Sequence, residues 1–82
     1  MATLVPHANL ARILGTQVIE SEAASIRELL AEIRARMDAA EWERTRRVTI
    51  LVNGVAIHRL SGLDTPLNAG DQVWMVVPSG GG

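Results

Sequence analysis

The chain has 82 residues, 48% of them hydrophobic, and a formal net charge of −1. A chain of this length can form one domain with a single modest core, and its composition excludes a disordered segment and a nucleic-acid-binding protein. The absence of cysteine excludes disulfides, thiolate metal sites and a cysteine nucleophile.

The N-terminal part predicts two short strands with one or two helical turns between them. Residues Ala2–Pro6 are typical of a strand, and Pro6 should end it because proline has no backbone N–H to donate. Apolar residues at helical spacing over residues 10–14 predict a short helix closed by Gly15. The β-branched segment Thr16–Glu20 predicts a second strand, and the short connection favours antiparallel pairing with the first.

The clearest helix begins at Ser25. Ser25 and Glu28 have the spacing of a capping box, in which each side chain accepts a hydrogen bond from the backbone amide of the other residue. Apolar residues then recur on one helical face, which predicts packing against a sheet. These residues are Ile26, Leu29, Leu30, Ile33 and Met37. Residues Asp38–Arg47 predict a further helical turn that runs into a polar connection, with Trp42 at the edge of the core.

The chain's basic residues are all arginines, eight in number, and it contains no lysine. Arg44, Arg46 and Arg47 form the only basic cluster. Glu41 and Glu43 stand beside it, which favours a solvated connection. Contact with an acidic partner surface is the alternative.

The C-terminal half predicts a hairpin and a last strand. Residues Val48–Val52 have the alternating pattern of a strand, and Asn53–Gly54 is a strong signal for a type I′ turn. Residues Val55–His58 are expected to form the returning strand of this hairpin. Residues Ser61–Asp71 predict a compact connection rich in turn residues. The last strand is expected at Val73–Val77.

The predicted order is strand, strand, helix, strand, strand, strand. One helix then crosses between two hairpin-like halves of a single sheet, and the first and last strands can lie side by side in its middle, in parallel. We therefore expect an α+β fold with a mixed sheet of four to five strands and one main helix packed on one face. The expected domain covers residues 1–78, and residues 79–82 form a flexible C-terminal tail.

The last strand presents two alternating sets of side chains. We assign Val73 and Met75 to the core, and Trp74 and Val76 to an exposed face that docks on a partner. The alternation fits the reverse assignment, with Trp74 in the core, nearly as well.

The sequence ends with Ser79 and three glycines after Pro78. Glycine has no side chain to bury and loses the most backbone entropy on ordering, so this tail is not expected to pack. It can thread through a channel too narrow for other residues, and four residues past Pro78 span at most about 13–14 Å. An inert, frayed terminus is the alternative.

The chain resembles the ubiquitin-like β-grasp sulfur carriers, which include the small subunit of molybdopterin synthase, the thiamine-pathway carrier and the cysteine-pathway carrier. The resemblance spans nearly the whole chain and rests on three motifs. These are Leu63-Asp64-Thr65-Pro66-Leu67, Gly70-Asp71-x-Val73, and Pro78 followed by Gly81-Gly82. Pro6 is more similar to the cysteine-pathway carriers, and the absence of phenylalanine departs from the molybdopterin synthase subunit.

The resemblance implies a carrier that is not itself an enzyme and binds no cofactor. In the family, a ubiquitin-activating-type enzyme uses Mg-ATP to adenylate the terminal carboxylate. Sulfur from a persulfide then produces a thiocarboxylate, which a sulfur-accepting synthase subunit consumes. By resemblance the thiocarboxylate forms on Gly82, next to Gly81. Partner contacts are expected from Ser79, Gly80, Trp74, Val76 and His7.

Two other functions stay open, a ubiquitin-like modifier joined through Gly82 to lysines of other proteins and an interaction module with an inert tail. No metal site is expected, and His7 and His58 are interpreted as surface histidines, because no acidic cluster stands at metal-ligand spacing. Since neither a membrane span nor a signal-peptide pattern is present, we expect a cytoplasmic protein that contacts neither membrane nor nucleic acid.

Overall fold

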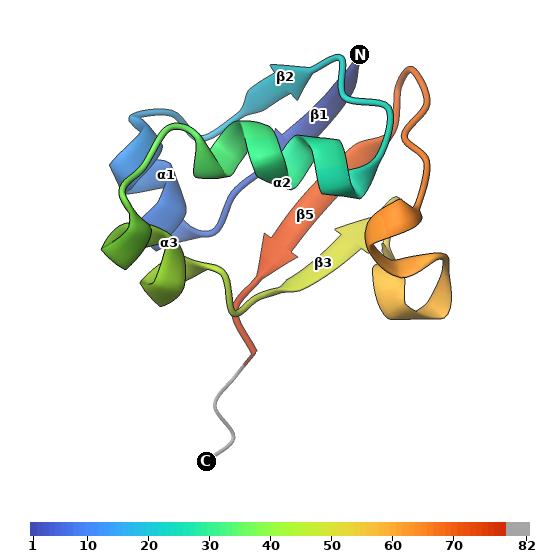
Figure 1. Ribbon diagram of the computed structural model, residues 1–82. Coiled ribbons are helices and arrows are strands. Elements are labelled where there is room, and N and C mark those ends of the chain that lie inside the picture. Colours follow the sequence, from blue (N-terminus) through green and yellow to red (C-terminus); the bar gives the residue numbers. More distant parts are fainter. Residues whose placement is uncertain (79–82) are drawn as a thin grey trace.

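A five-stranded mixed sheet organises the computed structural model, which describes residues 1–78 (Figure 1). Its elements in chain order are β1 (Ala2–Val5), α1 (Ala8–Leu14), β2 (Ile19–Ser21), α2 (Ile26–Arg34), α3 (Ala39–Thr45), β3 (Thr49–Val52), β4 (Val55–Ala56), the 3-10 turns η1 (Ile57–Arg59) and η2 (Gly62–Asp64), and β5 (Gln72–Val76). The strand order is β2-β1-β5-β3-β4. The first and last strands pair in parallel and the other neighbours are antiparallel. This arrangement confirms the predicted α+β class.

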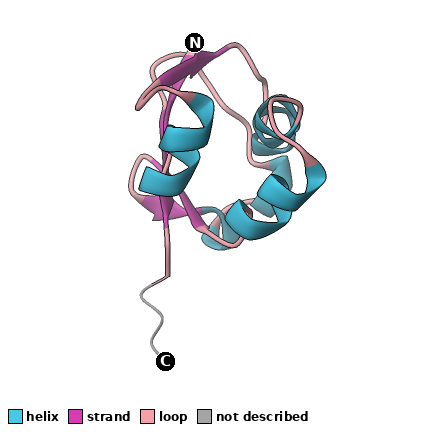
Figure 2. Cartoon of the chain, turned by 90° about the vertical axis from the view of Figure 1, so that its left-hand side faces the viewer, coloured by secondary structure: helices cyan, strands magenta, loops and turns pink. Residues whose placement is uncertain are grey.

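The core lies between one face of the sheet and α2, which crosses that face (Figure 1). Leu4 of β1 and Val73 of β5 are fully buried, and they meet as partners in the parallel pairing. The predicted apolar face of α2 is confirmed, because Ile26, Leu29 and Ile33 are no more than 1% exposed. In a view turned by 90°, the strands lie to one side of the molecule and most helical segments to the other (Figure 2).

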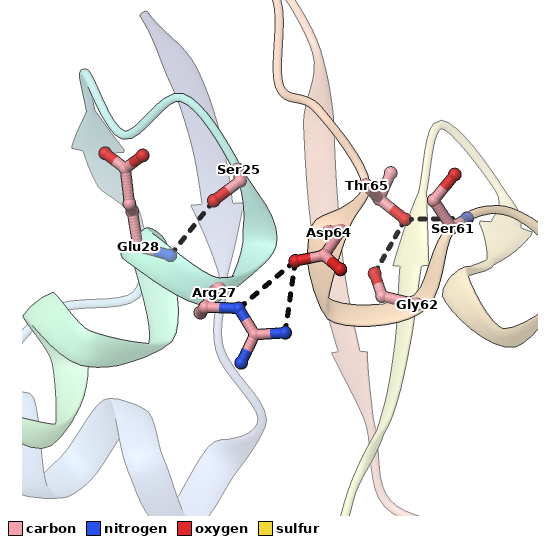
Figure 3. Close-up of polar contacts among 7 residues, drawn as sticks. All are labelled: Ser25, Arg27, Glu28, Ser61, Gly62, Asp64 and Thr65. Atoms are coloured by element: carbon pink, nitrogen blue, oxygen red, sulfur yellow. Dashed lines mark hydrogen bonds and ion pairs between the residues drawn. The ribbon is translucent and has the colours of Figure 1, made fainter.

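The start of α2 is capped by Ser25, but not through the reciprocal capping box that the sequence predicts (Figure 3). Ser25 Oγ accepts a hydrogen bond from the Glu28 amide at 3.2 Å. The Glu28 carboxylate instead accepts from the amide of Ala24 at 3.4 Å. The local sequence pattern therefore predicts the start of the helix correctly, but it predicts the wrong backbone amide as the partner of the Glu28 carboxylate.

The segment after α2 forms a complete short helix, α3, where the sequence predicts a further helical turn. Asp38 and Glu41 supply the reciprocal capping box, each side chain accepting from the other residue's backbone amide. Trp42 is partly buried against the core, as expected. Its ring lies 5.9 Å from the guanidinium carbon of Arg34, a cation–π contact.

Two predicted strands are shorter than the sequence pattern suggests. β2 begins at Ile19 because the Thr16 hydroxyl accepts from the Val18 amide and donates to the Val18 carbonyl, which closes a local turn. β4 contains only Val55–Ala56 before the chain turns into η1. The Asn53–Gly54 hairpin itself is confirmed, since both residues have positive φ, as a type I′ turn requires.

Candidate functional site

The carboxyl end of β5 is the candidate functional site. β5 lies between β1 and β3, so its position is fixed by hydrogen bonding on both sides. The strand ends at Val76, and the exposed residues Val77 and Pro78 carry the chain away from the sheet (Figure 1). The predicted tail residues lie outside the described part of the chain; they are Ser79, Gly80, Gly81 and Gly82.

The side chains of β5 alternate as expected. Val73 and Met75 are buried, whereas Trp74 and Val76 are each 44% exposed, so the assignment with Trp74 outside the core is confirmed. The outer side of β5 therefore exposes apolar surface from two of its residues, and the expected partner contact of Trp74 and Val76 stays a prediction.

Trp74 is flanked by apolar residues from both neighbouring strands. The pairing register places Val5 of β1 and Leu51 of β3 opposite Trp74, and both are half-buried. We call Val5, Leu51, Trp74 and Val76 the exposed sheet face. Sequence reasoning missed the contributions of Val5 and Leu51, because alternation within one strand does not reveal the register between strands.

The Leu-Asp-Thr-Pro-Leu motif holds the connection before β5 together (Figure 3). Thr65 is buried, and its hydroxyl accepts from the Ser61 amide at 3.1 Å and donates to the Gly62 carbonyl at 2.7 Å. Asp64 forms an exposed ion pair with Arg27 of α2, at 3.1 Å. The motif therefore has a structural role in this connection.

The same motif also fixes the way the chain enters α2. The Ile26 amide donates to the Thr65 carbonyl at 3.0 Å, and the Leu67 amide donates to the Ala24 carbonyl at 2.9 Å. These two bonds flank Ser25 and align it with Pro66 in an isolated bridge. This long-range pairing fixes the backbone on both sides of Ser25.

The Gly-Asp-x-Val motif holds the beginning of β5. The Asp71 carboxylate accepts from the Asn68 amide at 2.8 Å and from the Asn53 side-chain amide at 3.0 Å. These hydrogen bonds, the one from Asn68 first, lower the pKa of Asp71 below its ordinary value. Asn53 also accepts from the Gln72 amide, and the Thr3 amide donates to the Asp71 carbonyl. The hairpin, β1 and β5 are thereby joined at one end of the sheet.

His7 is buried, so the interpretation of both histidines as surface residues is wrong for His7 and correct for His58. Its Nδ1 accepts from the Leu10 amide and caps α1, and its Nε2 lies 3.3 Å from the Thr45 carbonyl at the end of α3. The neutral tautomer protonated at Nε2 makes both bonds. With 9% of the residue exposed, little of His7 is accessible to a partner, and the expected partner contact stays a prediction.

The predicted arginine cluster is exposed and only partly compensated. Arg46 pairs with Glu43 at 2.9 Å, which agrees with a solvated connection, and Arg44 and Arg47 are exposed. Among residues 1–78 no group of three histidine, aspartate or glutamate side chains could hold a metal ion. The helices in that range are too short or too polar to cross a membrane.

Comparison with known proteins agrees with this architecture. A family model described as the ThiS family matches residues 7–82. No curated protein is significantly similar to the chain in sequence.

Several solved structures share the fold. A chain in the crystal structure of the Amycolatopsis orientalis BexX/CysO complex is 19% identical, with a TM-score of 0.80 and 100% of both chains covered. The small archaeal modifier protein 1 (SAMP1) of Methanosarcina acetivorans is 23% identical with a TM-score of 0.80, over 99% of this chain and 95% of its own. CysO of Mycobacterium tuberculosis, described as an antigen, is 19% identical with a TM-score of 0.77, over 94% of this chain and 98% of its own.

Proposed function

Because the chain belongs to the ThiS family of ubiquitin-like β-grasp sulfur carriers, we propose that the carboxyl group of Gly82 is the sulfur attachment site. The observation that carries the proposal is the exit of the chain from the central strand, beside an exposed tryptophan. A partner that docks on the exposed sheet face would have the tail within reach of its own active site. The acid–base and phosphate-binding groups would then belong to the partner, and the carrier would supply position and a reactive end.

The proposed chemistry activates a carboxylate that is otherwise a poor electrophile. The Gly82 carboxylate attacks the α-phosphate of ATP bound to a ubiquitin-activating-type enzyme, which releases pyrophosphate and leaves an acyl-adenylate. The terminal sulfur of a persulfide displaces AMP to form an acyl disulfide. A thiol of the partner then attacks the other sulfur of that acyl disulfide, forms a disulfide with it and releases the thiocarboxylate as the leaving group. A sulfur-accepting enzyme consumes the thiocarboxylate in cofactor or metabolite biosynthesis.

The identity of that sulfur-accepting enzyme is a further proposal. The CysO chain of Amycolatopsis orientalis forms a complex with BexX, and we infer that this chain likewise docks on a larger protein. Pro6 and the absence of phenylalanine favour a cysteine-pathway-like partner over a molybdopterin synthase.

A second candidate, a protein modifier, is favoured by the fold shared with SAMP1, which its name describes as a modifier. Modification would join Gly82 to lysines of other proteins. Because this chain has no lysine, side-chain-linked chains of the protein itself could not form.

Intact mass spectrometry separates the two candidates. The protein is incubated with a ubiquitin-activating-type enzyme, Mg-ATP, a persulfide donor and a thiol. Sulfur transfer adds about 16 Da, since sulfur replaces oxygen, whereas modification produces covalent adducts on other proteins.

Tail variants provide the control for this experiment. Deleting Gly82 should abolish the mass gain while the unfolding midpoint stays at the wild-type value, and Gly81→Leu should impair threading for steric reasons. A mass gain that persists without Gly82 would refute the assignment of the attachment site.

A further inference from the structure

A hollow between α1 and α3 contains two arginines that are distant in sequence. Arg12 of α1 and Arg44 of α3 line it, together with Asn9, Ile13 and Thr45, and its volume is about 560 Å³. The sequence gives no sign of this pairing, because Arg12 stands alone on a short helix, more than thirty residues before the predicted cluster.

Neither guanidinium group takes part in an ion pair within the described residues. The ion pairs among residues 1–78 are Arg27–Asp64 and Arg46–Glu43, and neither involves Arg12 or Arg44. Both arginines are exposed. The residues that line the hollow therefore include two arginines and no carboxylate, on a chain whose formal net charge is −1.

The hollow lies at the end of the molecule where β5 ends. β1 and β5 run in parallel with Val5 opposite Trp74, so both strands leave the sheet at the same end. α1 begins at Ala8, shortly after β1, and the His7–Thr45 hydrogen bond holds its start against the end of α3. α1 and α3 accordingly lie at the end from which the chain leaves β5 (Figure 1).

We propose that this hollow binds an acidic side chain, a glutamate or an aspartate, on the surface of the protein that takes up the C-terminal segment. The proposal rests on the proposed function and adds to it a second, charged contact beside the apolar exposed sheet face. The planar guanidinium group of arginine can donate two parallel hydrogen bonds to a carboxylate, and two guanidinium groups can bind the same carboxylate from opposite sides.

The remaining lining fits this ligand. The Asn9 side chain offers a further donor, and half-buried Ile13 offers an apolar surface for a methylene stem. The negative net charge of the chain opposes binding of an extended polyanion, whereas a single carboxylate meets only the local positive field.

The test compares two double variants that remove the same charge. R12A/R44A removes the hollow's arginines. The control R27A/R59A removes two other exposed arginines, one in α2, which contacts η2, and one in η1. Binding of each full-length variant to the activating enzyme is measured as Kd by calorimetry without ATP, at low and high salt, after equal folding has been confirmed by circular dichroism.

Two exposed ion pairs between these arginines and the partner would contribute modestly to the free energy of binding. R12A/R44A should therefore raise Kd about 3- to 30-fold at low salt. The control should stay within about twofold of the wild type. The difference should shrink at high salt, because the Debye length falls from about 10 Å at 0.1 M to about 3 Å at 1 M. The kcat for adenylation at saturating carrier should not change, since neither arginine touches the reacting atoms.

Equal Kd values for the two double variants would overturn the inference. The inference would also be overturned if inorganic phosphate weakened binding to the enzyme at an ionic strength at which acetate has no effect. The hollow would then bind a phosphate-bearing ligand. Failure of the proposed function would look different, because the wild type would bind the enzyme and yet gain no sulfur.

Discussion

Replacing His7 with alanine should destabilise the protein, because its imidazole joins two helices. Both hydrogen bonds of the ring, to the Leu10 amide and to the Thr45 carbonyl, measure 3.3 Å. The alanine variant loses the cap of α1 and leaves the carbonyl at the end of α3 without this donor.

The expected size follows from these two losses. Removing a helix N-cap costs about 0.5–2 kcal/mol of unfolding free energy, and removing an ordinary hydrogen bond about 0.5–1.5 kcal/mol. Both hydrogen bonds are longer than the usual range of about 2.7–3.2 Å. We therefore take the lower half of each of these two energy ranges, which gives a total loss of about 1–2 kcal/mol of unfolding free energy. At about 4–8 °C per kcal/mol for a domain of this size, Tm should fall by about 4–16 °C.

Thermal and urea unfolding of three variants measure this effect. His7→Asn should be intermediate, because asparagine can cap the helix but is too short to reach Thr45. His58→Ala, at an exposed position, should stay within about 0.5 kcal/mol of the wild type. A His7→Ala variant that unfolds at the wild-type midpoint would refute this reasoning. If that variant also bound the activating enzyme more weakly, the predicted partner contact of His7 would be supported instead.

Three further predictions concern β5 and the residue before it. Met75→Ala should lower the free energy of unfolding by about 2–5 kcal/mol, because Met75 is buried. Trp74→Ala should mainly weaken binding to the activating enzyme, and Kd should rise by about 30-fold if Trp74 is an interface hot spot. Urea unfolding and calorimetry check both, and unchanged binding by Trp74→Ala would remove the exposed sheet face from the interface. The lowered pKa of Asp71 means that its carboxylate stabilises the fold above the ordinary value of 3.8, and that this stabilisation is lost as pH falls through the lower folded pKa. Asp71→Asn should therefore lose less stability than the wild type when urea unfolding is repeated at about pH 3 instead of about pH 6; equal acid sensitivity would contradict the hydrogen-bond network.

Features that depend on nearby residues could be predicted from the sequence. The apolar face of α2, the Asn53–Gly54 turn and the Gly15 terminus of α1 follow from periodicity and backbone freedom, and the structure confirms them. The burial of Val73 beside an exposed Trp74 follows from the alternation of a strand, once one face is chosen.

Features that depend on distant residues could not be predicted. His7 is buried because the end of α3 meets it, and Glu28 bonds Ala24 in a backbone segment aligned by residues 65–67. The proximity of Arg12 and Arg44 depends in the same way on how two short helices meet. Sequence spacing contains no information on these contacts until the topology is known.

The parallel pairing of β1 with β5 has a consequence for synthesis of the protein on the ribosome. Thr3 pairs with Gln72, so the middle of the sheet joins residues from near opposite ends of the 82-residue chain. Until β5 emerges, β1 and β3 lack the neighbour they share, and a nascent or truncated chain exposes two unmatched strand edges. Completion of the sheet therefore has to wait until β5 has been synthesised and has left the ribosome, because β5 is the strand that joins β1 to β3.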